Sequence, residues 1–451
     1  MNRTYIQHYK SLFTLGIPIV IGQVGVIILG FADTLMIGHH STNELAAASF
    51  VNNMFTLAII FATGFSYGLT PIVGSLFGRG ETSVVGRMLK NSIFANVLLA
   101  VLLTFIMWVL YLNIHRLGQP EELLPLMRPY FIVLLISLLF VLLFNAFKQF
   151  ADGITDTRVS MWLLLGGNVM NIIGNYILIY GKFGFPELGV VGAAVATVLS
   201  RYVEMAIVLV WTHKHKEINT YIVGLYKTMK IPGYLIKKFI IKGSPLLFNE
   251  TLWAAAQATL MQCYSVRGLS VVAAFNIANT IANLFNVVFI ALGDSVAIVV
   301  GQRLGAGKMD EARDLDNKMI AFSVMCCTGV AIVMFLIAPL FPQLYNTDST
   351  TRHLAEYLIM TQAVFMPQNA FLHATYFTLR SGGKTVVTFF FDSVFVWIVS
   401  VPIAFVLSRF TGLFVVVIFA CVNIADWIKC VIGFVLVKKG VWLQNIVSQK
   451  E

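Results

Sequence analysis

Twelve long apolar runs constrain this chain more than any other feature of its sequence. About 20 consecutive apolar residues are enough for a helix to cross a bilayer, and several of the runs are longer, so those helices must tilt or extend beyond the lipid. The sequence therefore predicts an all-α polytopic membrane protein with twelve transmembrane helices. With charged residues, glycine, proline and loop breaks as boundaries, the predicted spans are 12–38, 45–77, 88–113, 124–150, 158–180, 188–213, 239–266, 270–303, 318–345, 352–380, 384–409 and 412–437.

The composition excludes a soluble domain of this size. Hydrophobic residues make up 58% of the 451 residues and charged residues only 12%, and the mean hydropathy is +0.83. The formal net charge of +10 would be the one argument for a nucleic-acid partner. The lysines and arginines fall between the apolar runs, however, and do not form a basic face with aromatic residues. We therefore expect the lipid bilayer, and no nucleic acid, around this chain.

The distribution of basic residues predicts the orientation in the membrane. Counted in alternate connections, 22 Lys and Arg residues lie on the side that holds both termini and six lie on the other side. Connections rich in Lys and Arg stay in the cytoplasm, so we expect both termini there. A consistent asymmetry of this kind also supports an even number of spans.

The two halves of the chain are similar in sequence. At a shift of 227 residues, Gly16-x-Pro18 falls on Gly243-x-Pro245, and the turn GSLFGRG falls on GQRLGAG. Glycine and proline matches in one register are hard to obtain by chance. Six spans per half give both halves the same orientation, related by an axis along the membrane normal. The predicted organisation is two pseudo-symmetric six-helix bundles: an N-terminal lobe at 1–213, a basic cytoplasmic linker at 214–242 and a C-terminal lobe at 243–451.

Asp33 is the most informative single residue, because it lies inside the first apolar run. A carboxylate in a membrane helix costs roughly 2.5 kcal/mol or more on insertion scales, which makes it a functional candidate. Polar residues recur at helical spacing on later spans of the same half, and they offer oxygen ligands for sodium or a hydrogen-bonded site for a proton. The predicted ion- or proton-coupling site comprises Asp33, Asn145, Asn171, Asn175 and Thr197, with Asn168 on the same helix face as Asn171 and Asn175.

Structural alternatives remain open for this cluster. Asp33 lies near one end of its span, where a carboxylate can meet headgroup water or a local partner. The asparagines can also serve to hold helices together, at about 0.6 kcal/mol each.

A second polar cluster is predicted in the C-terminal half. The eighth span carries four asparagines at spacings of three, four and three, which place them on one helix face. Their apolar neighbours already supply a lipid-facing side, so this stripe should face protein or water. Glu250 in the seventh span is a second intramembrane carboxylate, although pairing with Lys242 is an alternative. The predicted second-lobe site comprises Glu250, Asn276, Asn279, Asn283 and Asn369, with Asn286, Gln257 and His373 as neighbours.

The remaining charged groups inside the spans are predicted to be structural. Arg201 and Glu204 stand three residues apart on one helix, as do Asp426 and Lys429, and such neighbours can pair. Asp392 in the eleventh span is assigned with them.

Sequence signatures of catalysis are absent. The chain has no Walker A glycine loop, no GxSxG elbow and no HExxH motif, and its cysteines follow no metal-binding pattern. We therefore expect neither enzymatic activity nor a cofactor, and no metal beyond a sodium ion at Asp33. Without a nucleotide-binding motif, any uphill transport must draw on an ion gradient.

Several motifs resemble those of one transporter family. They are Gly16-x-Pro18 followed by Asp33, the turn GFSYGLTPIVGSLFGRG, then NVMNIIGNYILIYG, LGVVGAAVAT, GSPLLFNETLW and LRSGGKT. Over nearly its whole length the chain resembles the multidrug and toxic compound extrusion (MATE) transporters. The resemblance implies two six-helix lobes and export coupled to an inward flow of sodium or protons.

The resemblance also implies roles for individual residues. Asp33 matches the first-helix aspartate that the family uses as a cation or proton site, and the other members of its predicted cluster match the surrounding ligands. Members with a well-defined sodium site often have a second carboxylate where this chain has Asn175. In the C-terminal half, Asn369 replaces an aspartate and Trp253 replaces the usual glutamate, with Glu250 about one turn earlier. Both protons and sodium therefore remain open as the coupling ion.

These observations predict a monomeric secondary antiporter of a bacterial inner membrane, which exports organic, cationic small molecules in exchange for H⁺ or Na⁺. Abundant Phe, Met and Tyr side chains on the spans suit flat, cationic, partly apolar compounds. The alternative is a flippase for lipid-linked saccharides, which a cleft rich in Arg and Lys would favour. The third alternative, a non-transporting membrane protein such as an enzyme or a channel, lacks a catalytic constellation or a repeated filter.

Overall fold

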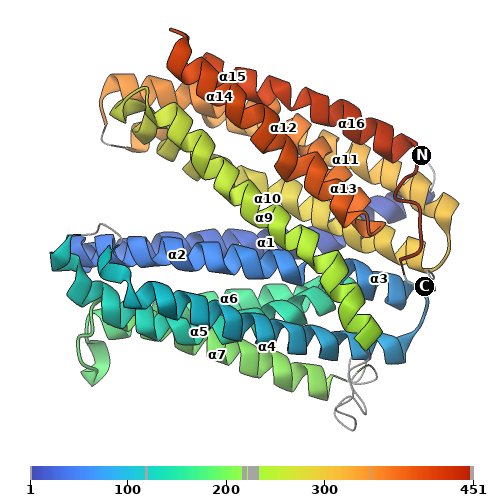
Figure 1. Ribbon diagram of the computed structural model, residues 1–451, viewed down its shortest axis with the longest axis horizontal. Coiled ribbons are helices and arrows are strands. Elements are labelled where there is room, and N and C mark those ends of the chain that lie inside the picture. The colour runs from blue at the N-terminus through green and yellow to red at the C-terminus, as the bar shows by residue number, and fades with distance from the viewer. Residues whose placement is uncertain (1–2, 117–119, 216–220, 222–232, 346, 447–451) are drawn as a thin grey trace. The chain divides into compact units, whose positions relative to one another are not determined.

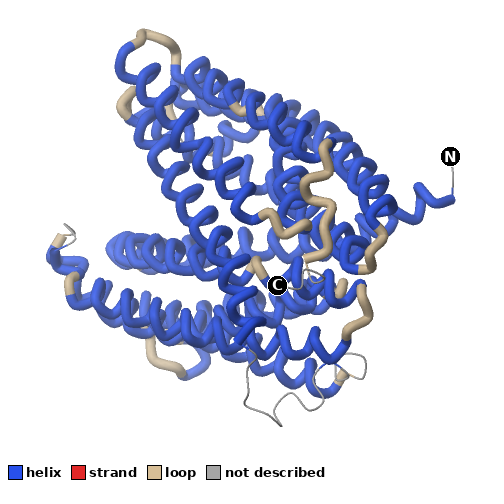
Figure 2. The backbone as a smooth tube through the Cα atoms, turned by 45° about the vertical axis from the view of Figure 1, so that its right-hand side comes forward, coloured by secondary structure: helices blue, strands red, loops and turns tan. Residues whose placement is uncertain are grey.

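The computed structural model describes residues 3–116, 120–215, 221, 233–345 and 347–446. Helices are the only regular secondary structure in these residues (Figures 1 and 2). Ten of the described helical segments are long and apolar enough to cross a membrane.

The helices of the first half follow the predicted spans closely. The one interruption is in the second span, where the helix ends at Ser66 and resumes at Leu69. The elements are α1 (Arg3–His40), α2 (Thr42–Ser66), α3 (Leu69–Gly78), α4 (Thr82–Leu112), η1 (Ile114–Arg116), η2 (Glu121–Leu123), α5 (Leu124–Gly153), α6 (Thr157–Ile179), η3 (Lys182–Gly184) and α7 (Val190–Lys214).

The second half contains four of these ten segments, and its helices are more irregular than those of the first half. The eleventh span contains two π-helical stretches, and the twelfth is divided at Asp426. The predicted linker lies largely outside the described residues, and its last part, 233–242, begins α9. The elements are α9 (Gly233–Ser265), α10 (Leu269–Gly305), α11 (Met309–Ile337), η4 (Phe341–Leu344), α12 (Ser349–Ser381), α13 (Thr385–Phe389), η5 (Phe390–Val394), η6 (Val396–Ser400), α14 (Val401–Phe410), α15 (Val415–Ala425) and α16 (Trp427–Lys438).

The chain forms two compact units. One comprises Ile21–Leu247, and the other comprises Met1–Val20 together with Phe248–Glu451. Two helices therefore contribute to both units, because α1 and α9 each begin in one unit and end in the other. The points of division, after Val20 and after Leu247, are 227 residues apart, which is the shift that relates the two halves in sequence.

Small residues bring α6 and α7 together in the Ile21–Leu247 unit. A Cβ atom at Gly192 would lie 2.5 Å from the carbonyl oxygen of Leu178, and one at Gly174 would lie 3.0 Å from the Cβ of Ala196. Small side chains at membrane-helix interfaces permit this close approach and the van der Waals packing that results. The polar residues of the two helices can consequently reach each other inside the unit.

A large aromatic and aliphatic cluster forms the core of the other unit. Tyr264 of α9 stacks on Phe275 of α10 with ring centroids 4.9 Å apart, and Phe419 of α15 meets both rings edge on. Leu15 of α1 joins a smaller buried cluster with Ile298 of α10. This burial is the reason that the beginning of α1 belongs with the second half of the chain.

Candidate functional site

Asp33 on α1 begins a continuous chain of hydrogen bonds that crosses to α6 and α7. The Asn175 amide nitrogen donates to an Asp33 carboxylate oxygen at 2.5 Å and to the Asn171 amide oxygen at 3.0 Å. The Asn171 amide nitrogen in turn donates to the Thr197 hydroxyl at 3.1 Å. Asn171 and Asn175 are one helical turn apart, so α6 presents both to the same side. The structure thus brings together four of the five residues predicted for the coupling site.

Asn145 is the predicted residue that lies outside this chain. Its amide nitrogen donates to the Thr63 hydroxyl of α2 at 3.2 Å, so within the described contacts it ties α5 to α2 and does not reach Asp33. The sequence placed Asn145 on a span near Asp33 but carried no information on which neighbouring helix its side chain faces.

Asn168 and Asn175 of α6 carry buried amide oxygens without a described partner, and of these two residues Asn175 is the one bonded to Asp33. Asn168, which is 4% exposed, has no hydrogen-bond partner for either amide atom among the described residues, and the same holds for the amide oxygen of Asn175. A Cβ atom at Gly25 of α1 would lie 3.1 Å from the Asn168 amide nitrogen, so α1 approaches Asn168 closely. Buried polar atoms normally have partners, and amide oxygens without one can ligate a cation or accept a proton-bearing group.

The predicted pair of Arg201 and Glu204 is present on α7 in the same unit. Arg201 donates to both carboxylate oxygens of Glu204 at 2.9 and 2.8 Å, and the Tyr130 hydroxyl of α5 donates to the Asn52 amide oxygen at 2.9 Å. Among the described contacts, the Glu204 carboxylate therefore bonds to a cation, whereas the Asp33 carboxylate bonds to an amide.

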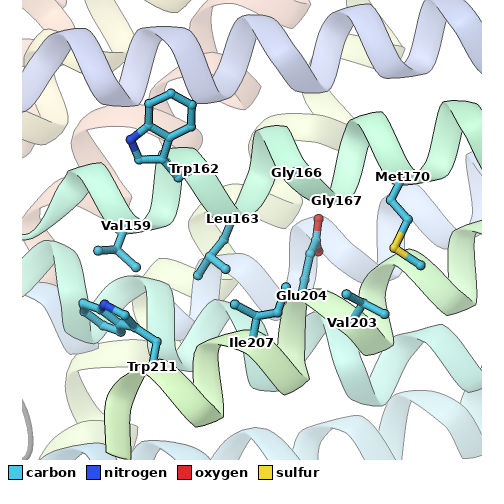
Figure 3. A pocket seen from close by; sticks show the side chains of 10 residues that line it. All are labelled: Val159, Trp162, Leu163, Gly166, Gly167, Met170, Val203, Glu204, Ile207 and Trp211. Atoms are coloured by element: carbon cyan, nitrogen blue, oxygen red, sulfur yellow. The ribbon is translucent and has the colours of Figure 1, made fainter. Parts of the chain in front are cut away.

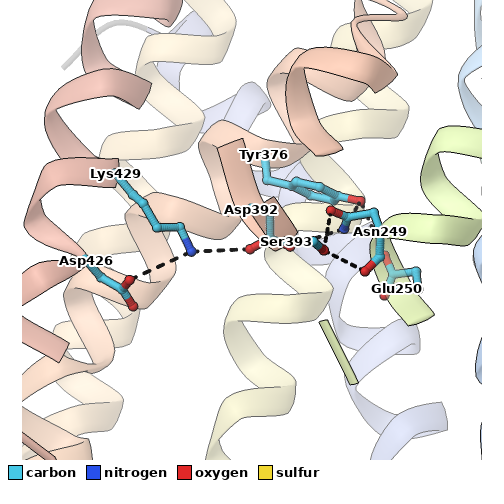
Figure 4. Close-up of polar contacts among 7 residues, drawn as sticks. All are labelled: Asn249, Glu250, Tyr376, Asp392, Ser393, Asp426 and Lys429. Carbon is cyan, nitrogen blue, oxygen red and sulfur yellow. Dashed lines mark hydrogen bonds and ion pairs between the residues drawn. The ribbon is translucent and has the colours of Figure 1, made fainter. Parts of the chain in front are cut away.

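A second polar network lies in the unit that contains Phe248–Glu451 (Figure 4). Asn249 of α9 is its centre: the amide nitrogen donates to the Tyr376 hydroxyl at 3.3 Å and to Asp392 at 3.1 Å. The Ser393 hydroxyl donates to the Asn249 amide oxygen at 2.8 Å. Tyr376 then donates to Glu250 at 3.3 Å. The network therefore joins α9, α12 and the π-helical stretch η5.

Lys429 extends this network to α16. Its ammonium group lies 3.3 Å from Asp392 and 4.0 Å from Asp426, so one buried cation stands between two carboxylates. The role predicted for these three residues from the sequence is structural. Their connection to Glu250 through Asn249 could not be predicted from the sequence, because the π-helical geometry of η5 is what turns Asp392 and Ser393 toward α9. Such π-helical stretches are frequent at functional sites.

The predicted asparagine stripe of α10 does not belong to this network. Asn276, Asn279 and Asn283 are exposed, and the Asn279 amide oxygen accepts a hydrogen bond from Gln362 at 3.0 Å. Among the described contacts none joins Asn369 to Glu250. The structure therefore keeps Glu250 from the predicted set but gives it a different partner, Tyr376. Tyr376, and Ser393 beside Asn249, were not predicted, since a lone Tyr or Ser in an apolar run carries no periodic signal.

His373, a predicted neighbour of Glu250, packs instead against an aromatic ring. Its imidazole lies 4.7 Å from the ring centroid of Phe289.

Comparison with known proteins identifies the family. The MatE family model matches residues 18–177 and 245–406. The chain belongs to the MatE family of transporters. Its two matched segments begin 227 residues apart, which agrees with the repeat seen in the sequence. Members of this family are transporters and not enzymes. Transporter relatives imply small-molecule substrates and a membrane environment for this chain.

Curated relatives and solved structures extend this assignment. The chain is 28% identical to the multidrug resistance protein MdtK of Pectobacterium atrosepticum over 90% of its own length and 88% of that protein. It is also 28% identical to MdtK of Yersinia pseudotuberculosis, over 98% of this chain and 97% of that protein.

Among solved structures, an outward-facing multidrug resistance MATE family transporter of the MOP superfamily has a TM-score of 0.85 at 21% identity, with 98% of this chain and 97% of that chain covered. The Vibrio cholerae MATE transporter VcmN in its bent form has a TM-score of 0.86 at 18% identity, with 98% of each chain covered. These likenesses confirm the predicted all-α fold with twelve transmembrane helices in two bundles.

Proposed function

We propose that this MATE transporter is a secondary antiporter that exports organic cations in exchange for H⁺ or Na⁺, with Asp33 as its coupling centre. The observation that carries the proposal is the hydrogen-bonded chain from Asp33 through Asn175 and Asn171 to Thr197. Export of drugs is supported by the names of the MdtK relatives. The protein acts as a monomer in a bacterial inner membrane with both termini in the cytoplasm, and it uses no cofactor.

The chain of amides gives Asp33 two states with different hydrogen bonds. Ionised Asp33 only accepts hydrogen bonds and is stabilised by the Asn175 amide nitrogen. Protonated Asp33 can donate, and the buried amide oxygen of Asn175, which has no partner among the described residues, can accept. An ion that binds one state better shifts the packing of α1 against α6 toward that state.

Sodium is accommodated by the same groups in a different way. One carboxylate and several amide and hydroxyl oxygens supply the hard ligands that such a cation prefers. Asp33 is the single carboxylate bonded to the amides, and either H⁺ or Na⁺ can neutralise it. These contacts therefore support both coupling ions, and a transport assay with each ion gradient distinguishes them.

Transport by reconstituted protein tests the proposal. Proteoliposomes are given either a proton gradient or a sodium gradient, and export of a fluorescent organic cation is measured for wild type, Asp33→Asn and Asp314→Asn. Asp314 is 63% exposed on α11, so its variant is the matched control and should export normally. Asp33→Asn should lose at least about 90% of gradient-driven export, since removing a group used in the coupling step costs well over 1.4 kcal/mol.

The outcomes separate the alternatives. Export driven by protons alone assigns H⁺ as the coupling ion, and export driven by sodium alone makes the amides ligands. Preserved export by Asp33→Asn would remove Asp33 from the mechanism. If neither gradient drives export by wild type, the exporter proposal fails and flipping of lipid-linked saccharides is the activity to assay.

A further inference from the structure

The end of α1 that follows Asp33 carries a histidine between two carboxylates. The Nδ1 atom of His40 lies 2.7 Å from a carboxylate oxygen of Glu44, in the first turn of α2. Its Nε2 atom lies 2.9 Å from a carboxylate oxygen of Glu187, in the connection that precedes α7. We refer to these three side chains as the His40 bridge. The His40 side chain is 19% exposed and that of Glu44 is 13% exposed, so the first contact is largely shielded from water.

The two contacts together require a positively charged imidazole. A neutral imidazole has one N–H group and donates from one ring nitrogen only, whereas the imidazolium donates from both. Because each ring nitrogen of His40 faces a carboxylate oxygen, the bridge is complete only when His40 is protonated. Histidine changes its charge between about pH 5 and 8, so pH decides whether the bridge forms.

The surroundings of His40 contain no competing positive charge among the described contacts. The titratable side chains that contact the imidazole are Glu44, Glu187 and Tyr180, and the Tyr180 ring at the end of α6 lies 6.1 Å from it. The charges described as acting on His40 are those of the same two carboxylates. The neighbouring His39 is exposed and has no described contact with either of them.

The backbone around the bridge brings the two carboxylates close together. Ser41 is the N-cap of α2 and accepts a hydrogen bond from the Glu44 backbone N–H at 3.5 Å. Glu44 therefore lies in the first turn, where the helix dipole favours a negative charge. Gly189 has a φ of +54°, and a Cβ atom there would lie 2.5 Å from a Glu44 carboxylate oxygen. The glycine thus lets the connection that carries Glu187 approach α2.

That connection joins two closely packed helices, α6 and α7. Figure 3 shows Glu204 of α7 extending to Gly167 of α6 beside the groove between them, and a Cβ atom at Gly167 would lie 1.7 Å from a Glu204 carboxylate oxygen. Nearer the connection, a Cβ atom at Gly192 would lie 2.5 Å from the Leu178 carbonyl oxygen. The position of Glu187 is therefore fixed relative to α6.

The His40 bridge also lies on the face of α1 that carries Asp33. Residues 33, 36 and 40 are spaced by three and four, so they share one side of the helix. On α6, Asn175 donates to Asp33 at 2.5 Å. Farther along both helices, the Tyr180 hydroxyl donates to the Met36 carbonyl oxygen at 2.8 Å. The contact of α1 with α6 thus runs from the coupling site to the bridge, over two helical turns.

We propose that His40 is a positioning residue for the coupling site. Its protonated imidazole ties the end of α1 to α2 and to the connection before α7, and so holds Asp33 against Asn175, whereas deprotonation releases the end of α1. This inference rests on Asp33 as the coupling centre of the proposed antiporter and deepens it with a control by pH. With both termini in the cytoplasm, as proposed, the bridge lies at the external face of the membrane and responds to the external pH.

Thermal unfolding of the purified full-length protein in lipid nanodiscs tests the bridge without any transport. A protonated histidine with carboxylate partners stabilises the folded state at low pH, and this contribution is lost as the pH rises. Between about pH 6 and about pH 9, the unfolding temperature of wild type should therefore fall at least about 2 °C more than that of His40→Gln. His40→Arg stays charged and should lack this extra loss. His39→Gln is the matched control and should behave like wild type.

Export of a fluorescent organic cation by proteoliposomes reports whether the bridge acts on Asp33. The ion gradients are held constant while the pH is varied at the face opposite the termini and, by the same amount, inside. Wild-type export should fall at least about threefold from about pH 6 to about pH 9, whereas His40→Arg should give a flat profile and His40→Gln a low rate throughout. A bridge that only stabilises the fold would leave the pH profile of export as it is in His40→Gln.

Glu187→Gln provides a second variant, because Glu187 is 65% exposed and its substitution leaves the helix packing unchanged. It should flatten both pH profiles as His40→Gln does. Combined with His40→Gln it should have no additional effect, since both substitutions break the same bridge.

The inference is overturned if His40→Gln or Glu187→Gln keeps the wild-type pH dependence of unfolding or export, or if His39→Gln acts like His40→Gln. Absence of wild-type export under every gradient rejects the proposed function alone, and the unfolding profiles then still support or reject the bridge. Wild-type export with a pH profile that His40→Gln shares rejects the positioning role and leaves the antiporter standing.

Discussion

Asn175 connects the two parts of the Asp33 site, because its single amide nitrogen donates both to Asp33 and to Asn171. It is fully buried, and its amide oxygen has no partner within the described residues. The residue at position 175 lies next to Asp33, so an amide there gives Asp33 a neutral neighbour and a carboxylate would give it a charged one. The choice between H⁺ and Na⁺ as the coupling ion should therefore be sensitive to it.

We expect Asn175→Asp to increase the affinity for sodium. Two carboxylates at hydrogen-bond distance repel each other unless they share a proton or bind a cation. Sodium should then stabilise the folded variant by at least about 1 kcal/mol more than it stabilises wild type, since a ligand that binds only the folded state adds to the free energy of unfolding. Thermal unfolding in sodium chloride against choline chloride measures this difference.

The matched control is Asn145→Asp, which adds a carboxylate to the same unit but beside Thr63, outside the Asp33 chain. It should show no extra response to sodium. An equal response in both variants would mean that sodium acts through general electrostatics and not through a site at Asp33.

Much of this site could be predicted from the sequence at the level of single residues. The spacing of Asn171 and Asn175 fixes their common face, because the helix repeat is a local property. The partner of Asn145 could not be predicted, since it depends on how α5 turns against α2. Tyr376 and Ser393 escaped prediction for a similar reason: their role arises only when α9, α12 and η5 meet at Asn249.

At the scale of the helices, the close packing of α10 against α12 depends on one glycine, Gly293. A Cβ atom at Gly293 of α10 would lie 2.4 Å from the Phe377 ring of α12. That ring lies 5.3 Å from the ring of Tyr376 and 5.2 Å from the Arg380 guanidinium. Close packing of the two helices therefore supports Tyr376, and through it the network around Glu250.

Gly293→Ala should consequently destabilise the protein by about 1–3 kcal/mol, the usual effect of overpacking a well-packed core. The control is Gly329→Ala on α11, where a Cβ atom would meet nothing within 4 Å, and which should be neutral or slightly stabilising. Thermal unfolding of both variants in the same detergent measures the difference. Equal stability of the two would show that Phe377 can move away without loss.

The positions of the elements were predictable, but their internal breaks were not. Hydropathy decides which segments enter the lipid, and ten of the described helices meet that criterion by themselves. The helices α9 and α12 are not among these ten, and their predicted spans depended also on charged residues, glycine, proline and loop breaks. The break between Ser66 and Leu69 and the π-helical stretches η5 and η6 leave hydropathy unchanged, so no apolar pattern reveals them. In η5 this hidden irregularity is what places Asp392 in contact with Asn249.

At the scale of the whole molecule, the sequence repeat and the two compact units place the division of the chain at different residues. The repeat predicts a division between lobes in the linker region, whereas the units divide inside α1 and inside α9. The beginning of each of these helices is packed with the unit that contains the other half of the chain. Periodicity and charge cannot reveal such an exchange, because both describe single helices and not their neighbours.

The exchange predicts that the two halves will associate without a covalent link. Co-expressed fragments 1–225 and 226–451 should purify together in detergent, because each carries a helix beginning that packs in the unit formed mainly by the other. Gly16→Leu should reduce the yield of the complex severalfold, since a Cβ atom at Gly16 would already lie 3.3 Å from the Ser295 hydroxyl and a larger side chain overpacks that contact. Ile17→Leu, at a half-exposed neighbouring position, is the control and should leave the yield unchanged. If the two fragments purify separately, or if both substitutions act alike, the packing of residues 1–20 does not hold the halves together.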